Sequence, residues 1–274
     1  MALLPVTRCG LGVLALVAAT TSPARAQYRD PYDGNWHFSF APYLWLPGFD
    51  GDFRFKTPSG AGGSPLVHAE STNVLSLVNL AFMANADMRK GKWSLLADFA
   101  YVDLSDDRAR MRTITAPSGM VEVPVNVATT ASLEGYVLTL GMAYSVYHDR
   151  DSMIDVLLGT RYLESRVSTS WNITGSVSLL PHSGRTDQKT GLWDAIIGVK
   201  GRYGFSGTHW FVDGYADVGT GASDITCYGV AGFGYAFDWG DVTLNYRYMH
   251  YGRGTRLFED LSLPGPSLGV RFQF

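Results

Sequence analysis

Eleven charged side chains share one spacing: each stands at a polar position in a stretch where polar and apolar residues alternate. They are Asp87, Asp98, Asp155, Arg161, Asp194, Lys200, Arg202, Asp213, Asp217, Arg247 and Arg271. Because successive side chains of a β-strand point to opposite faces, the alternation predicts that these groups lie on one common face. Carboxylates and cations gathered in that way can neutralise one another as ion pairs, or they can line a polar pathway for ions.

A second group of residues has the composition of an acid–base site. Asp103, Asp106 and Asp107 stand at the end of one alternating stretch, and His68 and His182 lie in the long segments between stretches. Aspartate and histidine are common general acids and bases, so a hydrolase with a site at this rim is the alternative function. However, no Asp-x-His pair occurs in the sequence. We therefore assign no catalytic residue.

The sequence gives no reason to expect a metal, a cofactor or a nucleic acid. No cluster of cysteine and histidine has zinc spacing, and 149–151 begins like a calcium loop without the glycine and glutamate that complete one. The formal net charge is −3 and the isoelectric point is near 6.0, which argues against binding to nucleic acid through bulk charge.

The elements that would position these residues are ten alternating stretches, each predicted to be a β-strand. They cover 36–46, 79–88, 93–104, 134–147, 153–162, 192–203, 210–219, 226–237, 242–251 and 267–274. The links after the even-numbered stretches are short, and four of the five after the odd-numbered ones are long. Short turns on one side and long loops on the other are typical of barrels that cross the outer membrane.

The composition agrees with a chain whose solvent is lipid. Apolar residues make up 46% of the 274 residues and charged residues only 17%, against about 25% charged in an ordinary soluble domain. Past the first 26 residues, no window of 18 residues is wholly apolar and uncharged, which excludes helical membrane spans. A closed barrel is the other structure that satisfies every backbone group inside lipid.

The amino terminus has the features of a secretory signal. One arginine precedes the apolar run 11–19, and Ala24-Arg25-Ala26 has the small–x–small pattern of a cleavage site. We expect residues 1–26 to be a signal peptide and residues 27–274 to form the barrel. The mature chain then holds a single cysteine, Cys227, and no internal disulfide.

The carboxyl terminus resembles the last strand of Gram-negative outer-membrane barrels, because apolar residues alternate up to a final aromatic. Val270, Phe272 and Phe274 carry that pattern. The resemblance implies recognition of these residues by the barrel-assembly machinery, with outer-membrane lipids and lipopolysaccharide around the barrel. As a whole, the chain is similar to small outer-membrane barrel proteins of proteobacteria.

Together these observations predict an all-β protein: a closed antiparallel transmembrane β-barrel of ten strands, within a range of 8–12, since residues 51–56 could form an extra strand. We expect a monomer in the cell outer membrane that is not an enzyme. Ten strands enclose a narrow interior that side chains can largely fill, so a packed, ion-paired lumen is the leading interpretation. The expected role is structural or adhesive, or that of a pore for small solutes.

Overall fold

The computed structural model describes residues 31–47, 49–54, 66–71, 78–115, 122–173, 183–252 and 258–274. The expected signal peptide lies outside the described residues. The strands are β1 (Trp36–Trp45), β2 (Phe49–Arg54), β3 (Leu66–Ser71), β4 (Val78–Lys90), β5 (Trp93–Thr115), β6 (Glu122–His148), β7 (Ser152–Ile173), β8 (Ser183–Gly204), β9 (Trp210–Gly221), β10 (Ile225–Phe237), β11 (Gly240–Gly252) and β12 (Phe258–Gln273).

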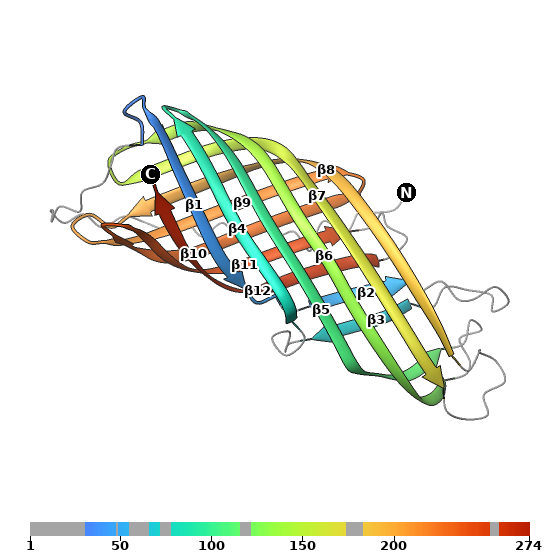
Figure 1. Ribbon diagram of the computed structural model, residues 1–274. Coiled ribbons are helices and arrows are strands. Elements are labelled where there is room, and N and C mark those ends of the chain that lie inside the picture. The colour runs from blue at the N-terminus through green and yellow to red at the C-terminus, as the bar shows by residue number, and fades with distance from the viewer. Residues whose placement is uncertain are drawn as a thin grey trace.

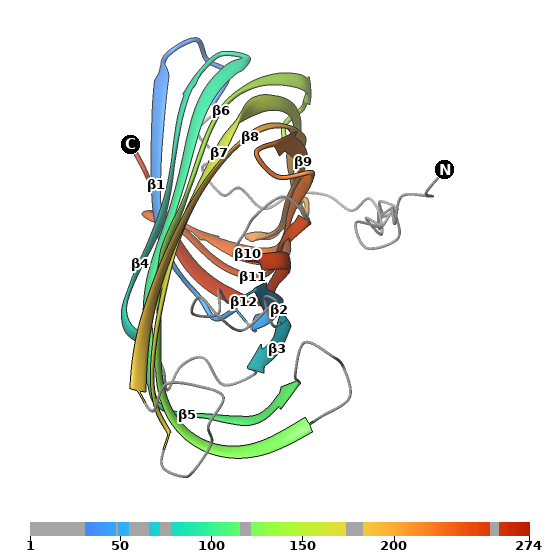
Figure 2. The same ribbon diagram turned by 90° about the vertical axis from the view of Figure 1, so that its right-hand side faces the viewer.

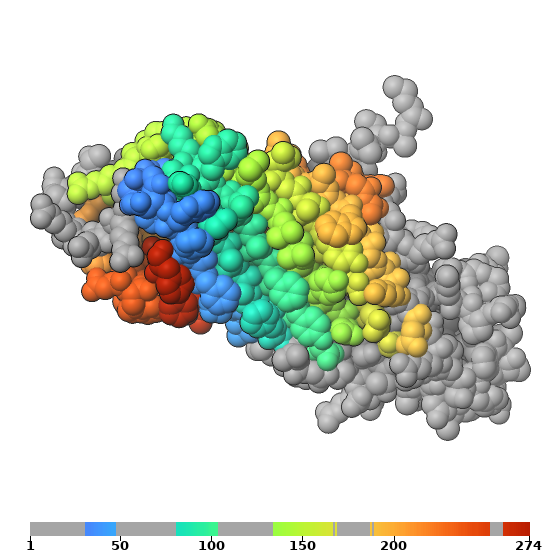
Figure 3. Space-filling model, turned by 45° about the horizontal axis from the view of Figure 1, so that its top comes forward, coloured from blue at the N-terminus to red at the C-terminus, as the bar shows by residue number. Residues whose placement is uncertain are grey.

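Ten of these strands close into a barrel. β1 and β4 to β12 pair in sequence order, every pairing is antiparallel, and β1 also pairs with β12 (Figure 1). The closing register joins Phe40 to Phe272 and Leu44 to Leu268. In Figure 3 the blue surface of β1 lies directly beside the red surface of the last strand. The predicted ten-stranded antiparallel barrel is confirmed.

The two ends of the barrel differ, as the lengths of the links predicted. We call the end with the short connections β4–β5, β6–β7, β8–β9 and β10–β11 the turn end, and the opposite end the loop end. Two of the turns are made by glycines with positive φ, Gly91 at 54° and Gly207 at 79°. The first residue of β1 and the last of β12 both lie at the turn end, because Trp36 pairs with Lys90 and Asp241 with Arg271.

A hairpin extends the sheet at the loop end. β2 pairs with β12 beyond the point where β1 stops, and β3 pairs with β2. The extra strand considered for residues 51–56 is therefore β2, at 49–54. The expectation that His68 lies in a loop was wrong, since its backbone is part of β3, opposite Asp52.

Strands β5 to β8 are much longer than expected. They have 22 to 27 residues, whereas β4 has 13 and β9 has 12. Their outer parts continue beyond the other strands (Figure 2). Most of the segments 105–133 and 163–191, expected as loops, are thus strand. The alternation did not reveal these extensions, because over residues 105–115 both faces of the strand carry an aspartate. A strand with water on both sides needs no apolar face.

The outer face of the barrel is apolar, as the alternation predicted. Leu158 and Ile197 are each 63% exposed on it. Near the turn end it carries an aromatic belt that includes Trp36, Trp93 and Trp210. A second belt crosses five strands as a chain of neighbouring rings with centroids 4.6–6.3 Å apart. Its members are Phe82, Phe99, Tyr136, Tyr162 and Trp193. An apolar band between two aromatic girdles is the outer surface that a lipid bilayer requires.

No helix among the described residues is long and apolar enough to span a membrane.

Inside the barrel, glycine allows β6 and β7 to approach closely. Gly141 and Gly159 are register partners, and a Cβ on Gly159 would lie 2.2 Å from the carbonyl oxygen of Leu140. We expect Gly159→Ala to lower the free energy of unfolding by about 1–3 kcal/mol, because backbone must move to admit the methyl group. The matched control is Gly229→Ala, since a Cβ there would meet nothing within 4 Å. Urea unfolding in detergent measures both, and equal midpoints for the two variants would contradict the expectation.

Candidate functional site

All eleven charged residues singled out from the sequence stand at inward-facing strand positions, so the candidate site is the barrel lumen. The structure adds Arg89 and Asp241, which are 5% and 2% exposed. The stretches predicted from the sequence leave both residues in the short links, 89–92 and 238–241. The two-residue period of a strand predicts that both face the lumen, because Arg89 is two residues after the inward Asp87 and Asp241 is two before the inward Thr243.

The most deeply buried ion pair joins Arg161 on β7 to Asp217 on β9, across the intervening strand β8. Both side chains are 0% exposed. The Arg161 guanidinium also donates from Nε to the Thr139 hydroxyl at 3.2 Å and from Nη1 to the Thr226 hydroxyl at 3.4 Å. Burial of such a pair is tolerated only when further hydrogen bonds satisfy its remaining groups.

A second buried cation, Arg247 on β11, lies inside the barrel against residues of four other strands. Its Nε donates to Ser267 Oγ at 2.9 Å, and its Nη1 donates to the Tyr228 hydroxyl. The guanidinium carbon stands 3.8 Å from the centre of the Tyr43 ring, a cation–π contact. Asp98 on β5 is 3.7 Å away. The carboxylate partner of Arg247 across the lumen is therefore Asp98.

The other ion pairs that the described residues form inside the lumen lie toward the turn end. Lys200 contacts Asp87 and lies 3.7 Å from Asp155, which also pairs with Arg89. On the other side of the lumen three ion pairs are linked, because Asp241 takes part in two of them and Arg271 in two. They are Arg202–Asp241 at 2.7 Å, Arg271–Asp241 at 3.5 Å and Arg271–Asp213 at 3.6 Å.

Asp194 is the exception among the eleven residues. It faces inward and is 1% exposed, but its carboxylate accepts hydrogen bonds from the backbone N–H of Ser223, at 2.8 Å, and from the Ser223 hydroxyl. Asp194 thus holds the short β9–β10 connection against the barrel instead of neutralising a cation.

Beyond the charged residues, an apolar layer fills the lumen toward the loop end. We use this name for the buried inward cluster formed by Tyr43, Trp45, Met83, Ala100, Val137, Leu163, Leu192, Tyr228, Met249, Tyr251 and Leu261. Its position follows from the strands: Leu163 is two residues beyond Arg161 on β7, and Met249 is two beyond Arg247 on β11. Two successive layers, one ionic and one apolar, therefore occupy the middle of the barrel.

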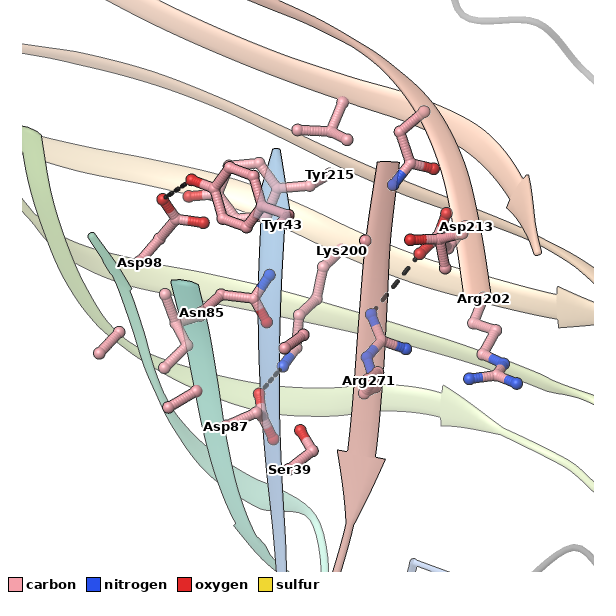
Figure 4. Close-up of a pocket in the computed structure, with 18 of the residues that line it drawn as sticks. Ser39, Tyr43, Asn85, Asp87, Asp98, Lys200, Arg202, Asp213, Tyr215 and Arg271 are labelled. Atoms are coloured by element: carbon pink, nitrogen blue, oxygen red, sulfur yellow. Dashed lines mark hydrogen bonds and ion pairs between the residues drawn. The ribbon is translucent and has the colours of Figure 1, made fainter. Parts of the chain in front are cut away.

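The turn-end half of the lumen is not filled. It encloses a cavity of about 260 Å³, shown in Figure 4, whose lining reaches His37, Gln273 and Phe274 at the ends of β1 and β12. Lys200, Arg202 and Arg271 project toward it (Figure 4). His37, which lines this cavity, also contacts Asp33. Hydrogen bonds from His37 and Asn35 lower the pKa of Asp33 to about 2.

Comparison with known proteins places the fold. No protein-family model matches the sequence, and no curated protein matches it. Among solved structures, the chain is similar to the outer membrane protease OmpT from Escherichia coli, with a TM-score of 0.54 and 8% identity over 88% of this chain and 98% of that chain. The fold is that of an outer-membrane β-barrel.

Other outer-membrane barrels match over similar lengths but less well in shape. Ail of Yersinia pestis covers 87% of this chain and 99% of its own at 10% identity, and Neisserial surface protein A covers 87% and 97% at 13% identity. Both have a TM-score of 0.33. At these identities the likeness concerns the fold alone.

The rim set considered for hydrolysis does not form a described site. His182 lies outside the described residues, and the backbone places His68 in β3 and Asp106 and Asp107 in the extension of β5. Of this set only the Asp103 side chain is described, and its strand position faces outward, opposite Glu134. Within the described part of the chain, no group of three or more His, Cys, Asp or Glu side chains could hold a metal ion.

A serine, a histidine and an aspartate do meet on the outer face of the barrel, near the loop end. His250 Nδ1 lies 3.0 Å from Ser262 Oγ and 3.3 Å from Asp260 Oδ1. In a nucleophile–base–carboxylate arrangement the histidine uses one ring nitrogen for the serine and the other for the carboxylate. Here both partners share Nδ1, so this geometry does not activate the serine.

Proposed function

We propose that the chain is a non-conducting outer-membrane surface protein, in which a monomeric barrel anchors an extended β-sheet outside the cell. The observation that carries the proposal is the closed lumen. The Arg161–Asp217 pair is fully buried, and the apolar layer lies directly beyond it. In this proposal the barrel is a membrane anchor and catalyses no reaction. Its outer face contacts lipids and lipopolysaccharide, and the barrel-assembly machinery recognises its last strand.

The length of β5 to β8 supports the display role. A membrane crossing needs about 9–11 residues per strand. β5 continues from Leu104, its last residue paired with β4, to Thr115. At about 3.3 Å per residue this extension adds roughly 35 Å. Together with the β2–β3 hairpin, it provides an extended β-sheet surface for a structural or adhesive contact.

The orientation follows from the same features, with the loop end outside the cell and the turn end in the periplasm. We expect an epitope inserted at Pro117, between β5 and β6, to be labelled by antibody on intact cells. An epitope inserted after Gly207, in the β8–β9 turn, should be labelled only after the outer membrane is permeabilised. The reverse pattern would overturn the proposal, and labelling of neither epitope after permeabilisation would show that the barrel does not reach this membrane.

A further inference from the structure

The turn-end cavity has a wall in which cations outnumber carboxylates. Five of its lining side chains are lysine or arginine, and three are aspartate. The counter-ions Asp155 and Asp241 do not line it and are 0% and 2% exposed. Arg202 therefore pairs with a carboxylate that is set behind it, whereas Lys200 pairs with Asp87, which itself lines the cavity. The charged ends of both cations form part of the surface that a solute would meet.

Arg271 is the most weakly held of these cations. Its contacts with Asp213 and Asp241 are 3.6 and 3.5 Å, longer than the 2.7–2.9 Å typical of charge-assisted hydrogen bonds. Its side chain is 25% exposed, the largest exposure among the lumen cations that form these pairs. A guanidinium has five N–H donors in a planar fork, so Arg271 keeps donors for a further acceptor.

Lys200 projects toward the same space from β8, and Ser39 on β1 also lines the cavity (Figure 4). A planar fork and a second cation around one cavity form a binding surface for an oxyanion, because carboxylate and phosphate groups accept several hydrogen bonds and carry the complementary charge. The volume of about 260 Å³ suits a small solute.

We propose that the turn-end cavity is a binding site for a small oxyanion, a carboxylate or phosphate compound, held by Arg271 and Lys200. In the orientation of the proposed function this solute comes from the periplasm, and the apolar layer keeps it from passing through. The binding itself does not depend on that orientation. A binding test in detergent can therefore fail while the cell-surface labelling succeeds, and the reverse.

The test uses Ser39→Cys in a Cys227→Ala background, so that the single thiol lies in the cavity. Its rates of reaction with the anionic 2-sulfonatoethyl and the cationic 2-(trimethylammonium)ethyl methanethiosulfonates report the local potential. A cation-rich wall of a low-dielectric cavity should favour the anionic reagent by about tenfold relative to a small free thiol. Inorganic phosphate or succinate should then slow the labelling, and the stronger of the two identifies the preferred acceptor group.

The control separates the site from general charge. Arg271→Gln should abolish both the anionic preference and the protection, whereas Arg150→Gln, in the exposed β6–β7 turn, should change neither. Faster reaction with the cationic reagent, no reaction with either reagent, or no protection by phosphate and succinate would each overturn the proposal. Lys200→Gln provides a second variant, with the same expected losses, should Arg271→Gln fail to assemble.

Discussion

Arg161→Ala is expected to lower the free energy of unfolding by about 3–5 kcal/mol, the cost of leaving one partner of a buried ion pair alone. Asp217 would keep a 0% exposed carboxylate, and its Oδ1 already has no hydrogen-bond partner in the described part of the chain. The measurement is the urea midpoint of the purified barrel in detergent, followed by tryptophan fluorescence and by the heat-dependent shift on gels.

Two variants make this result specific. Arg161→Met combined with Asp217→Leu removes both charges and should recover most of the stability, because apolar side chains of similar volume can replace a buried pair at little cost. Arg150→Ala, in an exposed turn, should leave the midpoint unchanged. If Arg161→Ala unfolds at the wild-type midpoint, the pair is hydrated and the lumen is not closed at this level.

Arg247→Ala is expected to have the second large effect, again about 3–5 kcal/mol, because it leaves Asp98 without its cation. The variant also removes the hydrogen bonds to Ser267 and Tyr228 and the contact with the Tyr43 ring. The Tyr43 hydroxyl, which donates to Asp98 at 2.8 Å, would remain as the partner of that carboxylate.

Arg271→Ala is the matched comparison for Arg247→Ala, since both residues are inward-facing lumen arginines. We expect it to cost less than about 1 kcal/mol, because the Arg271 side chain is 25% exposed and water screens its ion pairs, whereas the Arg247 side chain is 6% exposed. In addition, Asp241 keeps Arg202 as its partner. Equal losses of stability for the two variants would contradict the division of the lumen into a buried middle and an open turn end.

Much of the barrel could be predicted from the sequence, because alternation is a strictly local signal. Once one residue of a strand faces lipid, the period of two fixes the face of every other residue. That is why Asp155 and Arg161 stand at inward positions as expected. The lengths of β5 to β8 could not be predicted, since outside the membrane the apolar face that marks a strand is no longer required.

The pairing inside the lumen could not be predicted either. Which residues meet across a barrel depends on the tilt and stagger of the strands, and these are properties of the closed sheet as a whole. Shared parity alone allowed Arg247 to meet Asp217, whereas the closed sheet brings it to Asp98 and brings Asp217 to Arg161. The inward positions of Arg89 and Asp241 could not be predicted from the alternation alone, because both residues lie beside tight turns, where the ends of the strands are hard to locate.

Conductance in a planar lipid bilayer tests the central claim, that the lumen is closed, most directly. The account predicts that the purified wild-type protein inserts without producing steady current steps, since the buried Arg161–Asp217 pair and the apolar layer leave ions no path. Reproducible ohmic steps from the wild-type barrel, with an ion selectivity that Arg161→Ala alters, would contradict it.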